Sequence, residues 1–165
     1  MCASATSGTI TAHRRTRPEI SAVAYRHAVH DPFVRGTRRW PSSYLASIGL
    51  EKGAMVGLYS INRPEWVIAE QGSNFQALVT VPLYDTLGAE AIEFIINQTE
   101  MTIVFTTSDK LKNLTNISKK LPTLKRVVIM DGATPELVKQ GSDAGFEVIG
   151  FADAEKVRPG SKFGN

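Results

Sequence analysis

The sequence predicts an α/β protein built around a mostly parallel sheet of about four to five strands, joined by βαβ crossovers. From residue 49 onward, short apolar runs alternate with longer segments whose apolar residues recur every three or four positions. Pro64 and Pro135 stand where two of these longer segments begin, as prolines do in the first turn of a helix. Strands that alternate with helices of this length are typical of βαβ units, and 165 residues suffice for one domain with a real core.

The first strand is expected at Ala54 to Tyr59, an apolar run. Pro64 follows Asn62 and is placed as a first-turn helix proline, because that position needs no backbone hydrogen bond from its nitrogen. The helix that it opens is expected to run to about Ala77.

The second strand, Leu78 to Val81, is apolar and rich in β-branched residues, and it is therefore expected to be a buried strand. Pro82 should end its hydrogen-bonded ladder, because proline donates no backbone hydrogen bond. Asp85, Thr86 and Gly88 then predict a turn into the next helix. Short loops between a strand and a helix are where α/β proteins usually bind ligands.

The rest of the chain repeats this alternation. A helix from about Ala89 to Gln98 places Ile92, Ile95 and Ile96 on one face. The remaining expected elements are a strand at Thr102–Phe105, a helix capped by Ser108 or Asp109 and reaching Leu121, a strand at Arg126–Met130, a helix begun by Thr134 and Pro135 and ended near Gly145, and a short strand at Glu147–Ile149.

Three regions are expected along the chain: an irregular arginine-rich leader at residues 1–45, the α/β unit at 46–155 and a frayed tail at 156–165. Residues 1–50 carry seven arginines against two acidic side chains, a formal charge of +5. The leader has three interpretations. We favour a misassigned exon or start; the others are a targeting segment, which superficially resembles a mitochondrial transit peptide, and a genuine divergent leader.

Several functional classes are disfavoured by the sequence. Cys2 is the only cysteine, so disulfides and cysteine metal sites are excluded, and His27 and His30 have no third metal ligand beside them. The word ATSGT at residues 5–9 is typical of phosphate-binding loops, but no strand precedes it and no lysine follows closely, so we attribute it to chance. Because the positive charge is confined to the leader, nucleic acid is not an expected partner. No apolar run approaches the roughly 18 residues of a membrane span.

Three stretches carry a resemblance to a known family: GLEKGAMVGLYSINRPEW at residues 49–66, VTVPLYDTLG at 79–88 and AIEFIINQTEMTIVFTT at 91–107. Together they resemble the front part of long-chain acyl-CoA synthetases, which belong to the adenylate-forming enzymes. The resemblance implies an incomplete part of the N-terminal domain of that superfamily, with residues 46–155 as a partial subdomain. It also implies ATP, Mg²⁺ and coenzyme A (CoA) as cofactors of the intact enzyme and a long-chain fatty acid as its substrate.

The same resemblance assigns candidate CoA-binding residues. In related enzymes CoA approaches past the loop that corresponds to residues 83–88, which makes Tyr84, Thr86 and Gly88 candidate tunnel-lining positions. Basic side chains near the start of the following helix meet its nucleotide phosphate there, and Lys110 or Lys112 is the candidate contact in this chain. Lysines that open a helix oppose its macrodipole, which hints at an anion, although a solvated surface is the simpler interpretation. No catalytic residue and no metal ligand is assigned.

The expected function is that of a fragment of an ATP-dependent long-chain fatty acid–CoA ligase, which forms an acyl-adenylate and then a thioester with CoA. The phosphate loop, the adenine-binding segment, the ribose-binding aspartate and the C-terminal lysine of the family are not found in this sequence. The chain is therefore expected to be inactive alone. The alternative is a non-catalytic module that binds CoA or pairs with a full-length synthetase.

Expected partners and location follow from the same resemblance. Self-association is expected, because family members cover this sheet partly with later segments, and an uncovered edge promotes association. The expected location is cytoplasmic or peripheral on the membranes of the endoplasmic reticulum, peroxisomes or lipid droplets, with mitochondrial targeting disfavoured.

Overall fold

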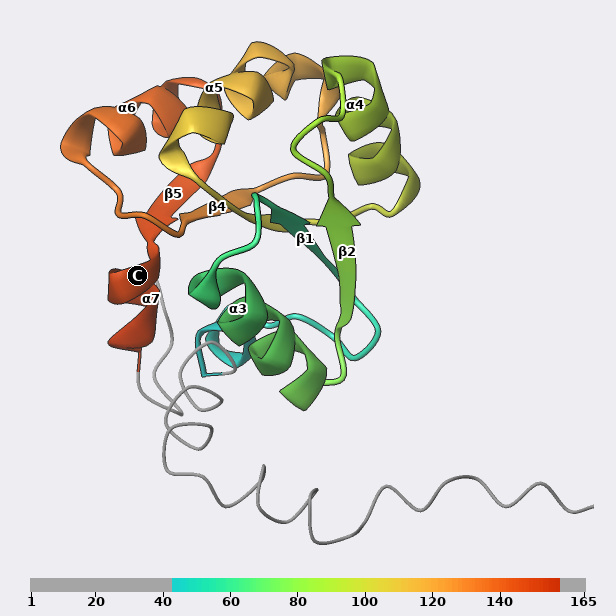
Figure 1. Ribbon diagram of the computed structural model, residues 1–165, viewed down its shortest axis with the longest axis vertical. Coiled ribbons are helices and arrows are strands. Elements are labelled where there is room, and N and C mark those ends of the chain that lie inside the picture. Colours follow the sequence, from blue (N-terminus) through green and yellow to red (C-terminus); the bar gives the residue numbers. More distant parts are fainter. Residues whose placement is uncertain (1–42, 158–165) are drawn as a thin grey trace, which may run out of the picture.

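A parallel sheet of five strands forms the centre of the computed structural model, which describes residues 43–157. The strands are hydrogen-bonded in the order β2-β1-β3-β4-β5 (Figure 1). They are β1 (Met55–Tyr59), β2 (Val79–Leu83), β3 (Ile103–Thr106), β4 (Arg126–Ile129) and β5 (Glu147–Gly150). Every pairing between these strands is parallel, which confirms the expected α/β class.

Helices cover both faces of this sheet. They are α3 (Pro64–Phe75), α4 (Ala89–Gln98), α5 (Ser108–Asn116) with the short 3₁₀ helix η1 (Ser118–Lys120), α6 (Pro135–Asp143) and α7 (Phe151–Glu155). In Figure 1, α4, α5 and α6 lie on one face and α3 and α7 on the other, in agreement with the side chains that they bury. β2 lies on one side of β1 in the sheet and β3 lies on the other side. The connection from β2 to β3 therefore crosses back over β1, in the direction opposite to the connection from β1 to β2. Right-handed crossovers therefore place α3 and α4 on opposite faces.

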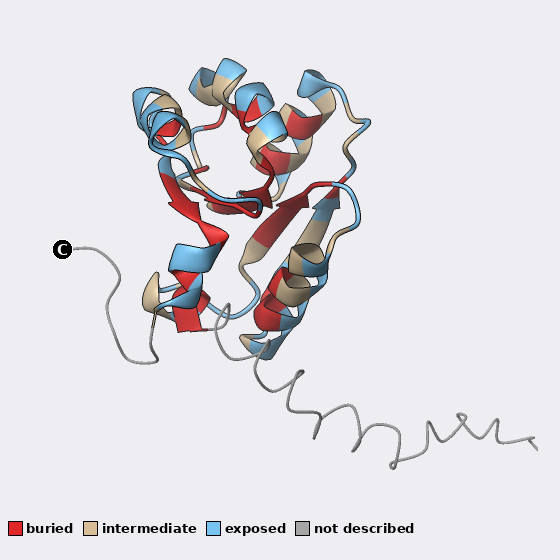
Figure 2. Ribbon diagram, turned by 60° about the vertical axis from the view of Figure 1, so that its left-hand side comes forward, coloured by how far each residue is buried: buried red, intermediate tan, exposed pale blue. Residues whose placement is uncertain are grey.

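Two apolar layers fill the space between the sheet and the helices, and the strands between them are largely buried (Figure 2). The layer beneath α3 and α7, the α3 layer, includes Val56, Leu58, Ala69, Ile103, Phe105, Val128, Phe151 and Ala154. The layer beneath α4, α5 and α6, the α4 layer, includes Tyr59, Leu83, Ile92, Ile96, Val104, Leu111, Leu114, Val127 and Val148. All four residues of β3 are buried, because helices cover both faces of this strand.

Most of the expected elements agree with the structure to within a few residues. The helix that Pro64 opens ends at Phe75, and the helix expected near residues 89–98 is found at Ala89–Gln98. Thr134 caps α6 as expected, since its side chain accepts a hydrogen bond from the Leu137 backbone N–H at 3.4 Å. The short strand expected at residues 147–149 is present as β5.

The interpretation of residues 78–81 as a buried strand that Pro82 ends is wrong. β2 is the edge strand of the sheet, and it continues through Pro82, which pairs with Leu58, to Leu83. Val79 is 46% exposed because, within residues 43–157, no strand lies beyond β2. Proline is compatible with an edge strand when its nitrogen faces the open side, so Pro82 does not interrupt the ladder with β1.

Three further features differ from the expectation. Residues 43–47 are helical and bury Tyr44 and Leu45, so the expected end of the leader at residue 45 lies inside a helix that belongs to the core. The helix expected to reach Leu121 divides into α5 and η1, and α7 was not expected at all. The rest of the leader, with ATSGT, His27 and His30, and residues 158–165 of the expected tail lie outside the described residues.

We expect Gly57→Ala to lower the free energy of unfolding by about 1–3 kcal/mol, the usual cost of overpacking a core. Gly57 lies inside β1, where an added Cβ would stand 2.8 Å from Met101 Sδ and 2.9 Å from Val104 Cγ2. Urea denaturation measures the change. Gly88→Ala is the matched control, because no atom lies within 4 Å of its added Cβ. Its expected cost is below about 1 kcal/mol, the modest preference for glycine over alanine at a helix N-cap. Equal costs for the two variants would contradict this account of the packing around Gly57.

Candidate functional site

The carboxyl ends of the five parallel strands meet at one edge of the sheet, and the loops that leave them form the candidate site. β1 and β3 are neighbours, but the chain leaves them in opposite directions along the sheet, β1 toward β2 and β3 toward β4. The two loops therefore diverge, and such a point in the strand order is the usual place for ligands in open α/β sheets. We call this region the carboxyl edge.

The loop after β2 presents the first group of predicted residues at the carboxyl edge. Tyr84 is 70% exposed, and Thr86 and Gly88 are exposed as well. The backbone turns tightly here, since the Leu87 N–H donates to the Tyr84 carbonyl at 3.1 Å. Gly88 is the N-cap of α4 in an extended conformation, and its carbonyl accepts hydrogen bonds from the first turn of that helix. The turn expected from Asp85, Thr86 and Gly88 is therefore confirmed.

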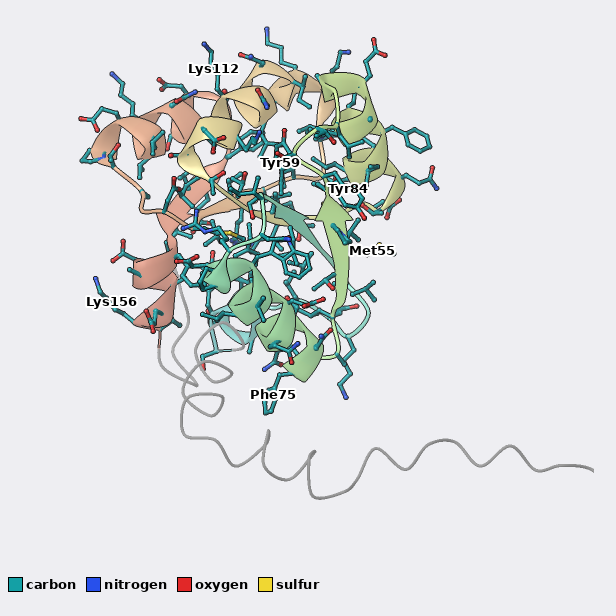
Figure 3. The ribbon with its side chains drawn as sticks, viewed as in Figure 1. Met55, Tyr59, Phe75, Tyr84, Lys112 and Lys156 are labelled. Carbon is teal, nitrogen blue, oxygen red and sulfur yellow. The ribbon has the colours of Figure 1, made fainter. Side chains whose placement is uncertain are left out.

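The two predicted lysines lie on different flanks of α5. They are two positions apart, so their side chains leave the helix about 200° apart around its axis. Lys110 shares its flank with Asn113, three positions further on, whose side-chain N–H₂ donates to the Tyr59 hydroxyl at 3.0 Å. Because Tyr59 belongs to β1, this is the flank toward β1 and β2. Lys112 lies on the outer side of α5, away from the Tyr84 loop (Figure 3). The structure thus places Lys110, and not Lys112, on the flank of α5 toward β1, where Lys110 Nζ lies 3.8 Å from Asp109 Oδ2.

The carboxylate of Asp131, in the loop after β4, holds the first turn of α5 in place. The Ser108 backbone N–H donates to Asp131 Oδ1 at 2.9 Å, and the Ser108 hydroxyl donates to Asp131 Oδ2 at 2.7 Å. The expected capping by Ser108 or Asp109 is wrong: Thr107 is the N-cap and its side chain makes no capping hydrogen bond. Asp131 satisfies the helix end instead, and its negative charge lies where the helix dipole favours it. This carboxylate also counters the unfavourable position of Lys110 in the first turn.

Tyr59 is a residue of the carboxyl edge that sequence reasoning missed. Its side chain is fully buried, its hydroxyl accepts from Asn113, and its backbone carbonyl accepts from the Thr106 hydroxyl at 2.9 Å. These two contacts tie the end of β1 to β3 and α5. A tyrosine at the end of an apolar strand was the one available signal, and it indicates equally well a simple core residue.

Arg63 lies in the loop after β1 and forms an ion pair with Glu65, with Nε 2.7 Å from Oε2. This pair satisfies the charge of the Arg63 guanidinium. The hydrogen bond from Arg63 lowers the pKa of the Glu65 carboxyl, and the same bond raises the pKa of the Arg63 guanidinium. Asp131 and Asp109 also face this guanidinium closely enough to raise its pKa further.

Within residues 43–157, no group of three histidine, cysteine, aspartate or glutamate side chains could hold a metal ion. In the same range, no helix is long and apolar enough to cross a membrane. Two surface hollows, of about 530 and 350 Å³, lie beside α4 and at the opposite edge of the sheet, and none of the predicted site residues lines them.

The comparison with protein families gives one match, described as AMP-binding enzyme, over residues 41–159. These residues include the whole of the sheet and its helices.

The chain is also similar in sequence to long-chain-fatty-acid–CoA ligases. Long-chain-fatty-acid–CoA ligase 1 of Cavia porcellus is 42% identical over 125 residues, which are 69% of this chain and 18% of that protein. Long-chain-fatty-acid–CoA ligase 1 of Homo sapiens is 43% identical over 115 residues, which are 63% of this chain and 16% of that protein. The chain thus spans less than a fifth of the length of these relatives.

Solved structures share the fold. The crystal structure of a putative long-chain-fatty-acid CoA ligase from Rhodopseudomonas palustris matches 87% of this chain and 37% of its own chain, with a TM-score of 0.64 and 18% sequence identity. At this identity the likeness extends to the fold alone.

We expect Asp131→Ala to lower the free energy of unfolding by about 1 kcal/mol, the usual cost of losing a helix cap. It should also speed hydrogen exchange at the Ser108 amide, because Asp131 accepts the hydrogen bond from that N–H. Asp109→Ala is the matched control in the same helix, since no hydrogen bond to a backbone N–H is found for its exposed side chain. Exchange at Ser108 that is equally fast in both variants would contradict the capping role of Asp131.

Proposed function

This chain belongs to the AMP-binding enzyme family, and on that premise we propose that it forms part of a long-chain fatty acid–CoA ligase. The observation that carries the proposal is the identity of about 40% with such ligases, 42% over 125 residues and 43% over 115 residues. In the intact enzyme, a fatty acid would react with ATP and Mg²⁺ to give an acyl-adenylate, and CoA would then displace AMP to form the thioester.

The contribution of this chain to that reaction is to form a scaffold beside the CoA path. Tyr84, Thr86 and Gly88 lie in the exposed loop after β2, and Lys110 lies on the flank of α5 that faces the same side. A lysine ammonium beside an exposed aromatic loop suits a ligand that carries both a phosphate and a nucleotide base. Lys112 points elsewhere and is not part of this proposal.

Alone, the chain is catalytically inactive under this proposal. Acyl-adenylate formation needs groups that hold the triphosphate and neutralise the charge that develops during transfer. The Thr-Ser-Gly word of the sequence is at residues 5–9, and no Pro-Lys-Gly follows it. The carboxyl edge offers Lys110 and Arg63, and each already faces a carboxylate: Arg63 pairs with Glu65, and Lys110 Nζ lies 3.8 Å from Asp109 Oδ2.

A second candidate function is a non-catalytic module that binds CoA or pairs with a full-length synthetase. The placement of Lys110 and the exposed Tyr84 loop favours CoA binding without any catalytic group. For both candidate functions, we propose a location in the cytoplasm or at the periphery of a membrane.

We expect the purified chain to release no pyrophosphate from ATP in a palmitate-dependent manner. A coupled pyrophosphate assay measures this, with heat-killed protein as the background and a full-length ligase as the positive control. Release above background that requires the fatty acid would overturn the proposed inactivity of the isolated chain.

If the isolated chain binds CoA, Lys110→Ala should weaken that binding roughly ten- to a hundredfold, the usual effect of losing one hydrogen bond to a charged group. Lys112→Ala, the matched control, should leave it unchanged. Titrations followed by amide chemical shifts give the affinities, and dephospho-CoA tests which phosphate is involved. The Lys110 effect should disappear with dephospho-CoA, because that ligand lacks the ribose phosphate. An equal loss for both lysine variants would count against the assigned flank of α5.

A further inference from the structure

The open edge of β2 and one stripe on the outer side of α3 carry uncharged side chains, and the partly exposed Glu70 borders this stripe. Val67, Gln71 and Phe75 are four positions apart and form one stripe along the outer side of α3, where Val67 is 53% exposed and Phe75 is 67% exposed. Phe75 projects from the end of α3, away from the sheet (Figure 3). The neighbouring strand has the sequence VTVPL, which is also uncharged. We call the stripe on α3 together with β2 the β2 edge face.

The backbone on the open side of β2 has few free hydrogen-bond donors. The Val79 N–H donates to the Ala54 carbonyl at 3.0 Å, so the backbone groups of Val79 point toward β1 and those of Thr80 point outward. Two positions away on either side, Pro82 has no N–H, and the Leu78 N–H already donates to the Ser73 carbonyl at 3.0 Å. Within residues 78–82, Thr80 therefore carries the one N–H that is free to pair with another strand.

The free backbone groups of the β2 edge match those of the same edge in a second copy when the two edges are centred on Thr80. If the β2 edges of two copies run antiparallel with Thr80 facing Thr80, the two residues exchange both of their backbone hydrogen bonds. Leu78 then faces Pro82 of the second copy, and neither has an N–H that would be buried without a partner.

The side chains of this register also match. Val79 faces Val81 of the second copy twice across the two-fold axis, which gives two cross-strand pairs of β-branched residues on the α4 side of the sheet. The two Thr80 side chains meet on the α3 side. Pairs of both kinds stabilise antiparallel strands.

Charge selects this face over the rest of the molecule. Residues 43–157 carry ten basic and fourteen acidic side chains, a formal charge of −4, so two copies repel each other on average. The outer sides of α4, α5 and α6 carry exposed charges, among them Glu90, Lys112 and Lys139. The β2 edge face has none, so two copies can approach there without opposing like charges.

We propose that the chain forms a symmetric dimer in which the β2 edges of two copies pair antiparallel about Thr80. The two five-stranded sheets then become one continuous sheet. Because the same surface is used on both copies, the contact closes after two subunits and does not propagate into a fibre. The absent N–H of Pro82 and the bond from Leu78 to Ser73 restrict the pairing to this register.

A charge-exchange experiment at Thr80 tests the two-fold axis directly in the full 165-residue chain. We expect wild-type protein to sediment as a dimer at high concentration, and Thr80→Lys and Thr80→Glu each to sediment as monomers, because like charges face each other across the axis. An equimolar mixture of the two variants should restore the dimer. The control Phe94→Lys, at a 66% exposed position on α4, should dimerise as wild type does.

Hydrogen exchange in the wild-type chain provides a test that needs no variant. Exchange at the Thr80 amide should slow as the protein concentration rises, because dimerisation pairs this N–H. A wild-type monomer at every concentration, a dimer that survives Thr80→Lys, a mixture that stays monomeric, or Thr80 exchange that does not depend on concentration would each overturn the proposal.

Discussion

The parallel pairing of β1 with β3 is the constraint on which the rest of the structure depends. The two strands are not consecutive in the chain, yet they are hydrogen-bonded neighbours from Val56–Ile103 to Tyr59–Thr106. To form this pair, the chain must cross back over β1 after it has completed β2. Right-handed connections then assign α3 to one face of the sheet and α4 to the other, and β2 remains at the edge. Both apolar layers and the open edge therefore follow from one pairing.

The same pairing determines what the carboxyl edge can do. Where β1 and β3 end side by side, the Thr106 hydroxyl donates to the Tyr59 carbonyl and Asn113 donates to the Tyr59 hydroxyl. These bonds hold α5 against the end of β1, and Asp131 holds the first turn of α5 from the other side. Lys110 thus leaves a helix whose beginning is fixed by two neighbouring strands. A side chain held in this way is suited to contact a ligand's charge.

The match to the AMP-binding enzyme family covers the sheet, its helices and the carboxyl edge together. The residues that match the family, 41–159, include an α/β layer with two apolar core layers, although this chain spans less than a fifth of the fatty acid–CoA ligases. A layer of this kind can fold around its own core and still expose an uncharged edge. The edge at β2 has only Thr80 as a free donor within residues 78–82, so its capacity to pair with another strand is small and tied to one register.

The sequence by itself determined the α/β class, the succession of strands and helices along the chain and most of their boundaries, because each of these depends on local signals. Pro64 and Pro135 stand at helix starts, and the isoleucines of α4 recur at helical spacing. The sequence words of residues 49–107 also sufficed to identify the family. Only the tertiary structure decided that β2 is an edge strand, that Asp131 caps α5, and that Lys110 leaves the flank of α5 that lies toward β1. The reason is physical: strand order, caps supplied from distant residues and the direction of a helix flank all depend on contacts between segments far apart in the chain. An apolar run such as residues 78–81 has the same composition at an edge as at the centre of a sheet, so the position of its neighbours decides whether it is buried.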